Sequence, residues 1–302
     1  MSSPHACPDC LRRSWLLALL APYIEKIVRR PPDALSLSVL ELSNEMLAAV
    51  AAPQTAEQIL ARISAIPESN FLGEIEDSHC WACCRHDELY PEQLTHDTSA
   101  PPALIGRGDP ALLSQINIDG TVAIVGARRA TSYGREISRR LGDELADSGI
   151  NVVSGLSFGV DGCAHRGAID HDGLTVAVLP CGPDQAYPAA HRSLWRRITE
   201  RGLVISEMPP GTSPWNWACF ARTRIIAGLA AMTIVVEAAP HSPSLIAVEQ
   251  AQRLRRRGVG AVPGPVTSRA SAGTNSLLKG GAQLVRSADD ILAHLGRRDG
   301  AS

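Results

Sequence analysis

The chain has 302 residues, of which 45% are hydrophobic and 20% are charged, and its formal net charge at pH 7 is −2. These proportions are typical of a globular protein, and the length allows one large domain and a smaller one. The near-neutral charge excludes a global basic field, so any binding of nucleic acid must depend on a local patch.

The first helical pattern, residues 13–29, contains the apolar run WLLALLAP at positions 15–22. This run is far shorter than the roughly 20 residues that cross a bilayer. It follows two arginines, as in a signal peptide, but it has no small-residue cleavage site, and we interpret it as the buried face of a helix. We therefore expect a cytoplasmic protein with no membrane partner and with reduced cysteines.

Two further helical patterns follow at residues 38–51 and 55–66, and the breaks fall at Pro31-Pro32 and Pro53. The composition changes near residues 86–110. We therefore predict a small helical N-terminal region over residues 1–86.

This N-terminal region holds five of the eight cysteines, and four of them form two C-x-x-C pairs. The pairs are Cys7 with Cys10 and Cys80 with Cys83, and their neighbours are Cys84, His5, His79 and His86. Four thiolates can hold one tetrahedral zinc ion, which would pin the N-terminus to the domain junction. Reduced thiols packed among apolar side chains are the alternative. No cofactor is required, but a structural zinc is a prediction that metal analysis tests.

Beyond residue 120 the pattern alternates between short β-branched runs and helical stretches. We predict strands at 122–125, 151–154, 175–179, 203–206, 233–237, 258–262 and 282–285. We predict helices at 134–148, 161–170, 190–201, 222–230, 244–256 and 288–295. Alternating elements with strands buried on both faces indicate an α/β fold, a doubly wound and mostly parallel Rossmann-like sheet. We assign this domain to residues 87–296 and a tail to residues 297–302.

The most informative segment is IVGARRATSYG at residues 124–134, a strand followed by a glycine turn and a helix start. A glycine at the strand end lets a ligand approach the backbone, and the helix N-terminus favours a phosphate. The residues predicted to bind phosphate here are Gly126, Arg128, Arg129, Ser132 and Gly134. The glycine spacing is not that of the dinucleotide motif, so NAD is not favoured.

Small residues also follow the other predicted strands, at the edge where open α/β sheets bind ligands. Gly155 and Gly159 follow one strand, and Ser242 and Ser244 follow another. Each loop alone is weak evidence, because turns use the same residues for local reasons. Their succession predicts an extended binding edge.

Taken together, these segments resemble the DprA/Smf family of DNA-processing proteins. The resemblance rests on IVGARRATSYG, VVSGLSFGVDGCAHRGA, TVAVLPCGPDQAYPAAHRSL, ISEMPPG, FARTRIIAGLA and AVPGPV, which occur in the family's order between about Tyr90 and Val285. The resemblance implies a single-stranded DNA-binding protein that forms a homodimer and helps load the RecA recombinase during natural transformation. It implies no enzymatic activity.

The resemblance also assigns roles to residues. Arg128 matches the arginine of the family's IVG-x-R motif, and Phe220, Arg222 and Arg224 match the aromatic and the two arginines of its F-P-x-R-N-R motif. Arginines along the backbone and an aromatic ring against a base are how single strands are held. The alternative for Arg222 and Arg224 is an ion pair with Glu207 or Glu237.

The chain departs from the family pattern at several places. Phe158 stands where the family has a basic residue, Thr223 replaces an asparagine, and Pro243 enters the loop before a helix. Residues beyond 296 leave no room for the winged-helix domain of many relatives, and the N-terminal cysteines are not part of the usual pattern. These differences indicate a divergent member, or a paralogue with weaker DNA affinity or a different ligand.

Two enzymatic alternatives remain open. Asp161 and His165 are four residues apart on one helix and could act as a base with its orienting carboxylate, or as a cap and a packed side chain. Rossmann-like proteins of the LOG type hydrolyse nucleoside monophosphates, but the glycines of their catalytic loop are absent from residues 240–244. A nucleotide-binding module without chemistry is a further alternative.

Overall fold

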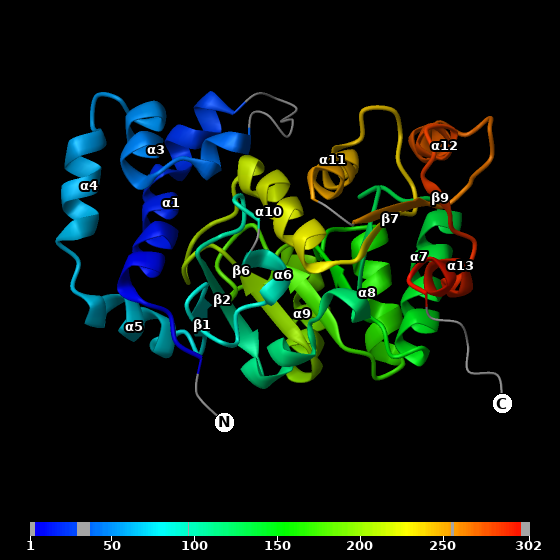
Figure 1. Ribbon diagram of the computed structural model, residues 1–302, viewed down its shortest axis with the longest axis horizontal. Coiled ribbons are helices and arrows are strands. Elements are labelled where there is room, and N and C mark those ends of the chain that lie inside the picture. Colours follow the sequence, from blue (N-terminus) through cyan, green and yellow to red (C-terminus); the bar gives the residue numbers. More distant parts are fainter. Residues whose placement is uncertain (1–3, 29–36, 96, 255–256, 297–302) are drawn as a thin grey trace.

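A computed structural model describes residues 4–28, 37–95, 97–254 and 257–296, and within them one nine-stranded sheet forms the centre of the molecule (Figure 1). The strand order is β1-β2-β6-β5-β4-β3-β7-β8-β9. The strands are β1 (Trp81–Cys84), β2 (Ala103–Gly108), β3 (Thr121–Val125), β4 (Asn151–Ser154), β5 (Thr175–Val178), β6 (Leu203–Ser206), β7 (Met232–Val235), β8 (Gly258–Ala261) and β9 (Gln283–Leu284).

The strands from β3 to β9 are parallel, and this confirms the predicted doubly wound sheet. From β3 the chain moves outward through β4, β5 and β6, and it then returns to the other side of β3 to form β7. The direction of winding therefore reverses between β3 and β7. Loops diverge at such a point, and a crevice opens outside the carboxyl ends of the two strands.

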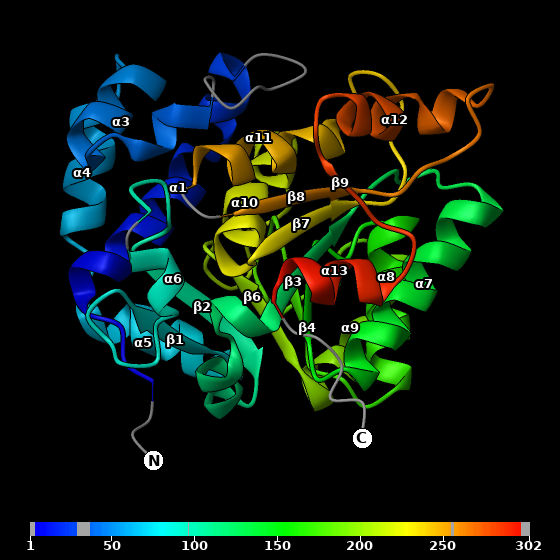
Figure 2. The ribbon, with the colours of Figure 1, turned by 45° about the vertical axis from the view of Figure 1, so that its right-hand side comes forward.

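The sheet is covered on both faces (Figure 2). Val122 and Ile124 point toward α7, α8 and α13, whereas Ala123 and Val125 point toward α10 and α11, as the alternation of a strand requires. The helices of this domain are α6 (Glu92–Thr95), α7 (Ser132–Asp147), α8 (Val160–Asp170), α9 (Arg192–Arg201), α10 (Asn216–Leu229), α11 (Ile246–Arg253), α12 (Ala272–Lys279) and α13 (Ala288–His294).

The N-terminal region consists of helices that pack beside the sheet (Figure 1). They are α1 (Pro8–Ile27), the 3₁₀ turn η1 (Ser38–Glu41), α3 (Asn44–Ala51), α4 (Ala56–Ser64) and α5 (Glu68–Asp77). Shorter 3₁₀ turns in the rest of the chain are η2 (Pro110–Gln115), η3 (Ile118–Gly120), η4 (Ala189–His191), η5 (Pro243–Leu245) and η6 (Arg269–Ser271).

Helix α1 is buried, as the sequence predicted. Leu16, Leu20 and Ile24 are fully buried in a core that continues through Ile105 of β2 to Trp217 of α10. The Trp217 indole donates a hydrogen bond to the Ala21 carbonyl at 3.1 Å. None of the helices that the structure describes combines the length and the apolar character that a membrane span requires.

Strands β1 and β2 were not predicted, and β1 lies inside the region 1–86 that the sequence assigned to helices. The two strands extend the sheet in the antiparallel sense, β1 on β2 and β2 on β6. Gly106 packs directly against the Trp81 ring, so the pairing depends on a contact between strands rather than on a local pattern. The predicted tail 297–302, the Pro31-Pro32 break and the ends of the predicted helices at Arg29 and Arg256 lie outside the described residues.

Candidate nucleic-acid interface

A pocket of about 310 Å³ lies at the crevice between β3 and β7. Its walls come mainly from three loops and from helix α10, and α8, α11 and η6 contribute one residue each. We call the three loops, residues 126–131 after β3, 155–159 after β4 and 236–245 after β7, the rim. Among the predicted site residues, those that line the pocket are Gly126, Arg128, Arg129, Phe220, Arg222, Ser242 and Ser244. The structure thus gathers residues from positions 126 to 244 at one place.

Arg128 and Arg129 are the exposed cations of the rim. Both side chains are exposed, and no described residue forms a hydrogen bond or an ion pair with either guanidinium. An arginine without a protein partner offers its full set of donors to a ligand, and a phosphate accepts two of them at once. These two residues have the properties expected of a phosphate contact.

Glycines fix the loop that carries these arginines. Gly159 has a φ of +75°, and a Cβ there would collide with the Ala127 carbonyl, which accepts a hydrogen bond from Val160 N at 3.2 Å. A Cβ on Gly126 would lie 2.6 Å from Val160 Cγ2. The first two rim loops therefore pack backbone to backbone, and these glycines act by permitting that contact.

The amino end of α7 is occupied by a carboxylate, contrary to the prediction of a phosphate there. Glu237 Oε2 accepts from Thr131 N at 2.8 Å, and Glu237 Oε1 accepts from Thr131 Oγ1 at 2.7 Å. Thr131 Oγ1 in turn accepts from Gly134 N at 3.2 Å. A Cβ on Gly134 would lie 2.6 Å from the Glu237 carboxylate, so this glycine makes room for the cap. Ser132 and Gly134 do not line the pocket.

Arg222 lines the pocket but is directed into the protein. It is 4% exposed, and its guanidinium donates to the Gly155 carbonyl, to the Val178 carbonyl at 2.8 Å and to Ser157 Oγ at 2.6 Å. A Cβ on Gly155 would lie 2.7 Å from this guanidinium. The predicted phosphate contact at Arg222 is therefore replaced by a brace across the ends of β4 and β5.

Arg224 does not line the pocket, so the structure does not place it beside Arg128 and Arg129 as the sequence predicted. Its Nη2 lies 2.5 Å from Glu207 Oε2, and the two side chains are 4% and 5% exposed. The ion pair considered as the alternative is the one that forms. Glu207 and Glu237 both have protein partners, and neither lines the crevice.

The far side of the pocket is formed by α10 and the loop before α11. Phe220 is half-buried and lines the pocket together with Thr223. Ser242 and Ser244 also line it, and their hydroxyls are 2.9 Å apart. An aromatic side chain close to exposed arginines is the combination that holds a single strand.

Phe158 adds an aromatic ring to the rim itself, in addition to Phe220 on α10. It is 47% exposed, and its ring meets the edge of His191 at a centroid distance of 5.0 Å. The sequence identified this position only as the loss of a basic residue. The structure shows an exposed apolar side chain beside Gly159.

Asp161 and His165 do not form a catalytic pair. Asp161 accepts a hydrogen bond from Ser157 N at 3.2 Å, and burial raises the pKa of its carboxyl group. His165 lies inside the core with Nδ1 2.7 Å from Thr175 Oγ1, and burial lowers its pKa to about 3. The Thr175 hydroxyl donates to the Val152 carbonyl, so His165 must carry its proton on Nδ1. These are structural roles.

The structure does not bring together the four cysteines predicted to hold zinc. Cys83 is fully buried on the face of β1 that packs against Leu104, and Cys80 Sγ donates to the Ser78 carbonyl at 3.5 Å. Cys7 and Cys10 instead meet Cys84 and His86. The predicted pair Cys80 and Cys83 is wrong because two residues three apart face opposite sides of an extended strand.

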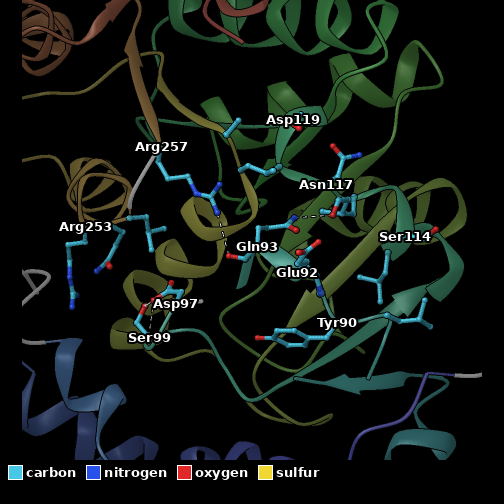
Figure 3. A pocket seen from close by; sticks show the side chains of 18 of the residues that line it. Tyr90, Glu92, Gln93, Asp97, Ser99, Ser114, Asn117, Asp119, Arg253 and Arg257 are labelled. Atoms are coloured by element: carbon cyan, nitrogen blue, oxygen red, sulfur yellow. Dashed lines mark hydrogen bonds between the residues drawn. The ribbon is translucent and has the colours of Figure 1, made fainter. Parts of the chain in front are cut away.

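A larger hollow of about 1340 Å³ lies at the opposite edge of the sheet, before β3, β7 and β8 (Figure 3). Its cations have protein partners: Arg253 pairs with Glu41 at 2.7 Å, and Arg257 donates to the Gly228 carbonyl at 3.0 Å. The hollow also carries Glu92, Asp97 and Asp119, which repel a phosphate. Size alone does not make it the site, because ligands of open α/β sheets bind at the carboxyl edge.

Comparison with known proteins agrees with this geometry. The family model described as DNA recombination-mediator protein A matches residues 81–296. A putative DNA processing protein DprA of Mycobacterium tuberculosis is 43% identical over 195 residues, which is 65% of this chain and 50% of the relative. The Smf protein of a Synechocystis strain is 36% identical over 242 residues, 80% of this chain and 60% of the relative. The chain thus spans about half the length of the mycobacterial relative.

Two solved structures resemble the whole fold or most of it. The DNA processing protein A of Streptococcus pneumoniae has a TM-score of 0.74 and 30% identity, and the match covers 94% of this chain and 95% of that one. The second is a DNA processing protein A of Helicobacter pylori, and its structure is described as giving insight into its single-stranded DNA binding mode. It has a TM-score of 0.61 and 27% identity, and the match covers 69% of this chain and 93% of that one. The parallel sheet, the glycine-bearing rim and the matched 216-residue segment (81 to 296 inclusive) place this chain in the DNA recombination-mediator protein A family, to which the DprA and Smf proteins belong.

Proposed function

We propose that this protein binds single-stranded DNA along the rim and acts in DNA processing during natural transformation. The observation that carries the proposal is the pair Arg128 and Arg129, which are exposed and without a partner among the described residues, beside a pocket that contains Phe220. Guanidinium groups hold the phosphates, and the aromatic ring supports a base. The relative from Helicobacter pylori, described as binding single-stranded DNA, supports the same assignment.

We also propose that the protein works as a homodimer and helps load the RecA recombinase. This part rests on membership of the family. Light scattering should give twice the chain mass of 32.1 kDa. The RecA function is measured as RecA ATPase activity on single strands coated with single-strand-binding protein. We expect stimulation by the wild-type protein and loss of that stimulation when Arg128 and Arg129 are both replaced.

The central experiment is a titration of a fluorescent oligo(dT) by anisotropy at several salt concentrations. We expect Arg128→Ala to weaken binding about fivefold at low salt, since an exposed ion pair is worth up to about 1 kcal/mol. The slope of log K against log salt should fall by about 0.7 for each phosphate contact removed. The double variant Arg128→Ala/Arg129→Ala should therefore lower the slope by about 1.4.

Arg62→Ala is the matched control, because Arg62 is an exposed arginine on α4, remote from the rim in sequence and in the fold. It removes the same charge and should leave both affinity and slope unchanged. Equal losses in Arg62→Ala and Arg128→Ala would show a non-specific charge effect and would contradict the rim. The same samples incubated with nucleoside monophosphates should release no free base, because Asp161 is the one carboxylate among the described pocket residues and it is already hydrogen-bonded.

A further inference from the structure

The amino end of α1 meets the end of the edge strand β1 in a cluster of sulfur and nitrogen atoms. Cys7 precedes α1, Cys10 lies in its first turn, Cys84 ends β1, and His86 follows in the next turn. Cys7 and Cys84 are 77 positions apart in sequence. The fold therefore brings these four side chains together from two distant segments.

The distances from the His86 nitrogen to the three sulfurs fit a tetrahedral site. His86 Nδ1 lies 3.5 Å from Cys7 Sγ, 3.7 Å from Cys10 Sγ and 3.8 Å from Cys84 Sγ. All four atoms lie within 4.8 Å of one another. With bonds of about 2.3 Å to sulfur and 2.1 Å to nitrogen, a tetrahedral zinc ion separates its sulfur and nitrogen ligands by about 3.6 Å. The three distances from nitrogen to sulfur lie close to that value.

The surroundings also suit a metal ion. Cys10 and Cys84 are buried, Cys7 is half-buried and His86 is exposed, so the site has a closed floor and one side open to solvent. The Cys7 backbone N–H donates to Cys84 Sγ at 3.4 Å, a contact that supports the negative charge of a thiolate ligand. The His5 backbone N–H donates to the Asp87 carboxylate and holds the start of the chain against the same turn.

We propose that Cys7, Cys10, Cys84 and His86 bind one structural zinc ion that fastens the N-terminal helices to the edge of the sheet. Three thiolates and one imidazole are a ligand set typical of closed structural zinc sites. The ion closes a long loop between the two segments and holds β1 at the edge of the sheet. This role is independent of the binding of DNA at the rim.

The test begins with the full-length chain purified under reducing conditions and analysed for metal by mass spectrometry. We expect close to one zinc per chain. Replacement of zinc by Co²⁺ should give the intense visible bands of a tetrahedral ion and a thiolate-to-cobalt charge-transfer band. Less than a tenth of an equivalent of zinc after incubation with Zn²⁺, with all thiols reduced, would overturn the proposal, as would a content of iron in place of zinc.

Two variants identify the ligands. His86→Ala removes an exposed side chain, so the protein should still fold, and it should weaken zinc binding at least tenfold in competition with a chromophoric chelator. Cys84→Ser should lose the ion and the cobalt spectrum. Cys80→Ser is the matched control, because Cys80 lies near the other end of β1, and it should keep a full equivalent. Loss of zinc in Cys80→Ser, or full retention in His86→Ala, would refute this ligand set.

Discussion

Arg224 has one role by sequence and another by structure: the sequence predicts a contact with DNA, whereas the structure shows a buried ion pair with Glu207. If Arg224 contacted DNA, its removal would weaken DNA binding and leave stability unchanged. In the structure its guanidinium is buried against Glu207 at 2.5 Å, with Nε and Nη1 lacking a partner among the described residues. Removing one member of such a pair leaves a buried charge without compensation, which typically costs about 3–5 kcal/mol.

A second buried arginine, Arg13, determines how much stability is lost when Arg224 or Glu207 is replaced. It is buried nearby and donates to the Leu40 carbonyl at 2.7 Å. Burial lowers the pKa of its guanidinium to about 10, a net value in which the Glu207 charge opposes the shift and the Arg224 charge adds to it. After Arg224→Met the Glu207 carboxylate keeps one cationic neighbour, so we expect a loss of about 3 kcal/mol. After Glu207→Gln two buried cations share no carboxylate, and we expect about 5 kcal/mol.

The assay is urea unfolding followed by tryptophan fluorescence, with DNA affinity measured on the same samples. The double variant Glu207→Leu/Arg224→Met should lose less stability than the sum of the single losses, because no buried charge of this pair remains. Under native conditions Arg224→Met should bind oligo(dT) within about twofold of wild type, because Arg224 does not line the pocket and changes away from a site are usually worth less than about 0.5 kcal/mol. If Arg224→Met changed stability by less than about 1 kcal/mol and weakened DNA binding fivefold, our assignment of the residue to the core would be refuted.

The remaining predictions concern three other positions. The pKa of His165 is lowered from about 6.5 to about 3, so below pH 6.5 the unfolded state takes up a proton that the folded state does not bind, and stability is lost as the pH falls. In urea titrations wild type should lose roughly 3 kcal/mol more stability than His165→Gln between pH 6.5 and pH 4. Equal losses in the two proteins would contradict this. Gly159→Ala should lower folding stability by at least about 2 kcal/mol and weaken DNA binding. The control Gly149→Ala, at a residue with a φ of +68° and open space around it, should lower stability by about 1 kcal/mol and leave DNA binding unchanged. Similar losses of stability in both variants would argue against the packed rim. Phe158→Lys should tighten binding severalfold and raise the salt slope by about 0.7, and an unchanged slope would mean that the strand does not pass over Phe158.

The sequence predicted the parallel strands well because their signal is local. Short β-branched runs such as residues 122–125 have to be buried on both faces, and the following helical stretches allow only right-handed crossovers between parallel strands. Strands β1 and β2 have no such signal. Their pairing depends on Trp81 lying over Gly106, and that contact joins residues 25 positions apart.

The sequence predicted that residues of several loops meet at one edge of the sheet, but it did not predict the contacts that they make. Residues 222 and 224 of one helix are separated by about 200° around its axis, so the two arginines of the motif cannot face the same surface. Which of them faces the rim depends on how α10 packs on the sheet. The partner of Thr131 is Glu237, 106 positions away, and no spacing rule could identify it.

On the proposed role, the hydrogen-bonded polar groups behind the rim and its exposed arginines act together. Glu237 accepts two hydrogen bonds from Thr131 and so holds the first rim loop. Arg222 donates to the Val178 carbonyl at the end of β5 and to the Gly155 carbonyl of the second rim loop. If Arg128 and Arg129 bind phosphate as we propose, they lose little backbone freedom, because their loop is already held to the sheet, and less of the interaction energy is offset by ordering. Substituting Glu237 should therefore weaken DNA binding even though its negative charge repels phosphate, because a loop released from the sheet must be ordered again each time a strand binds.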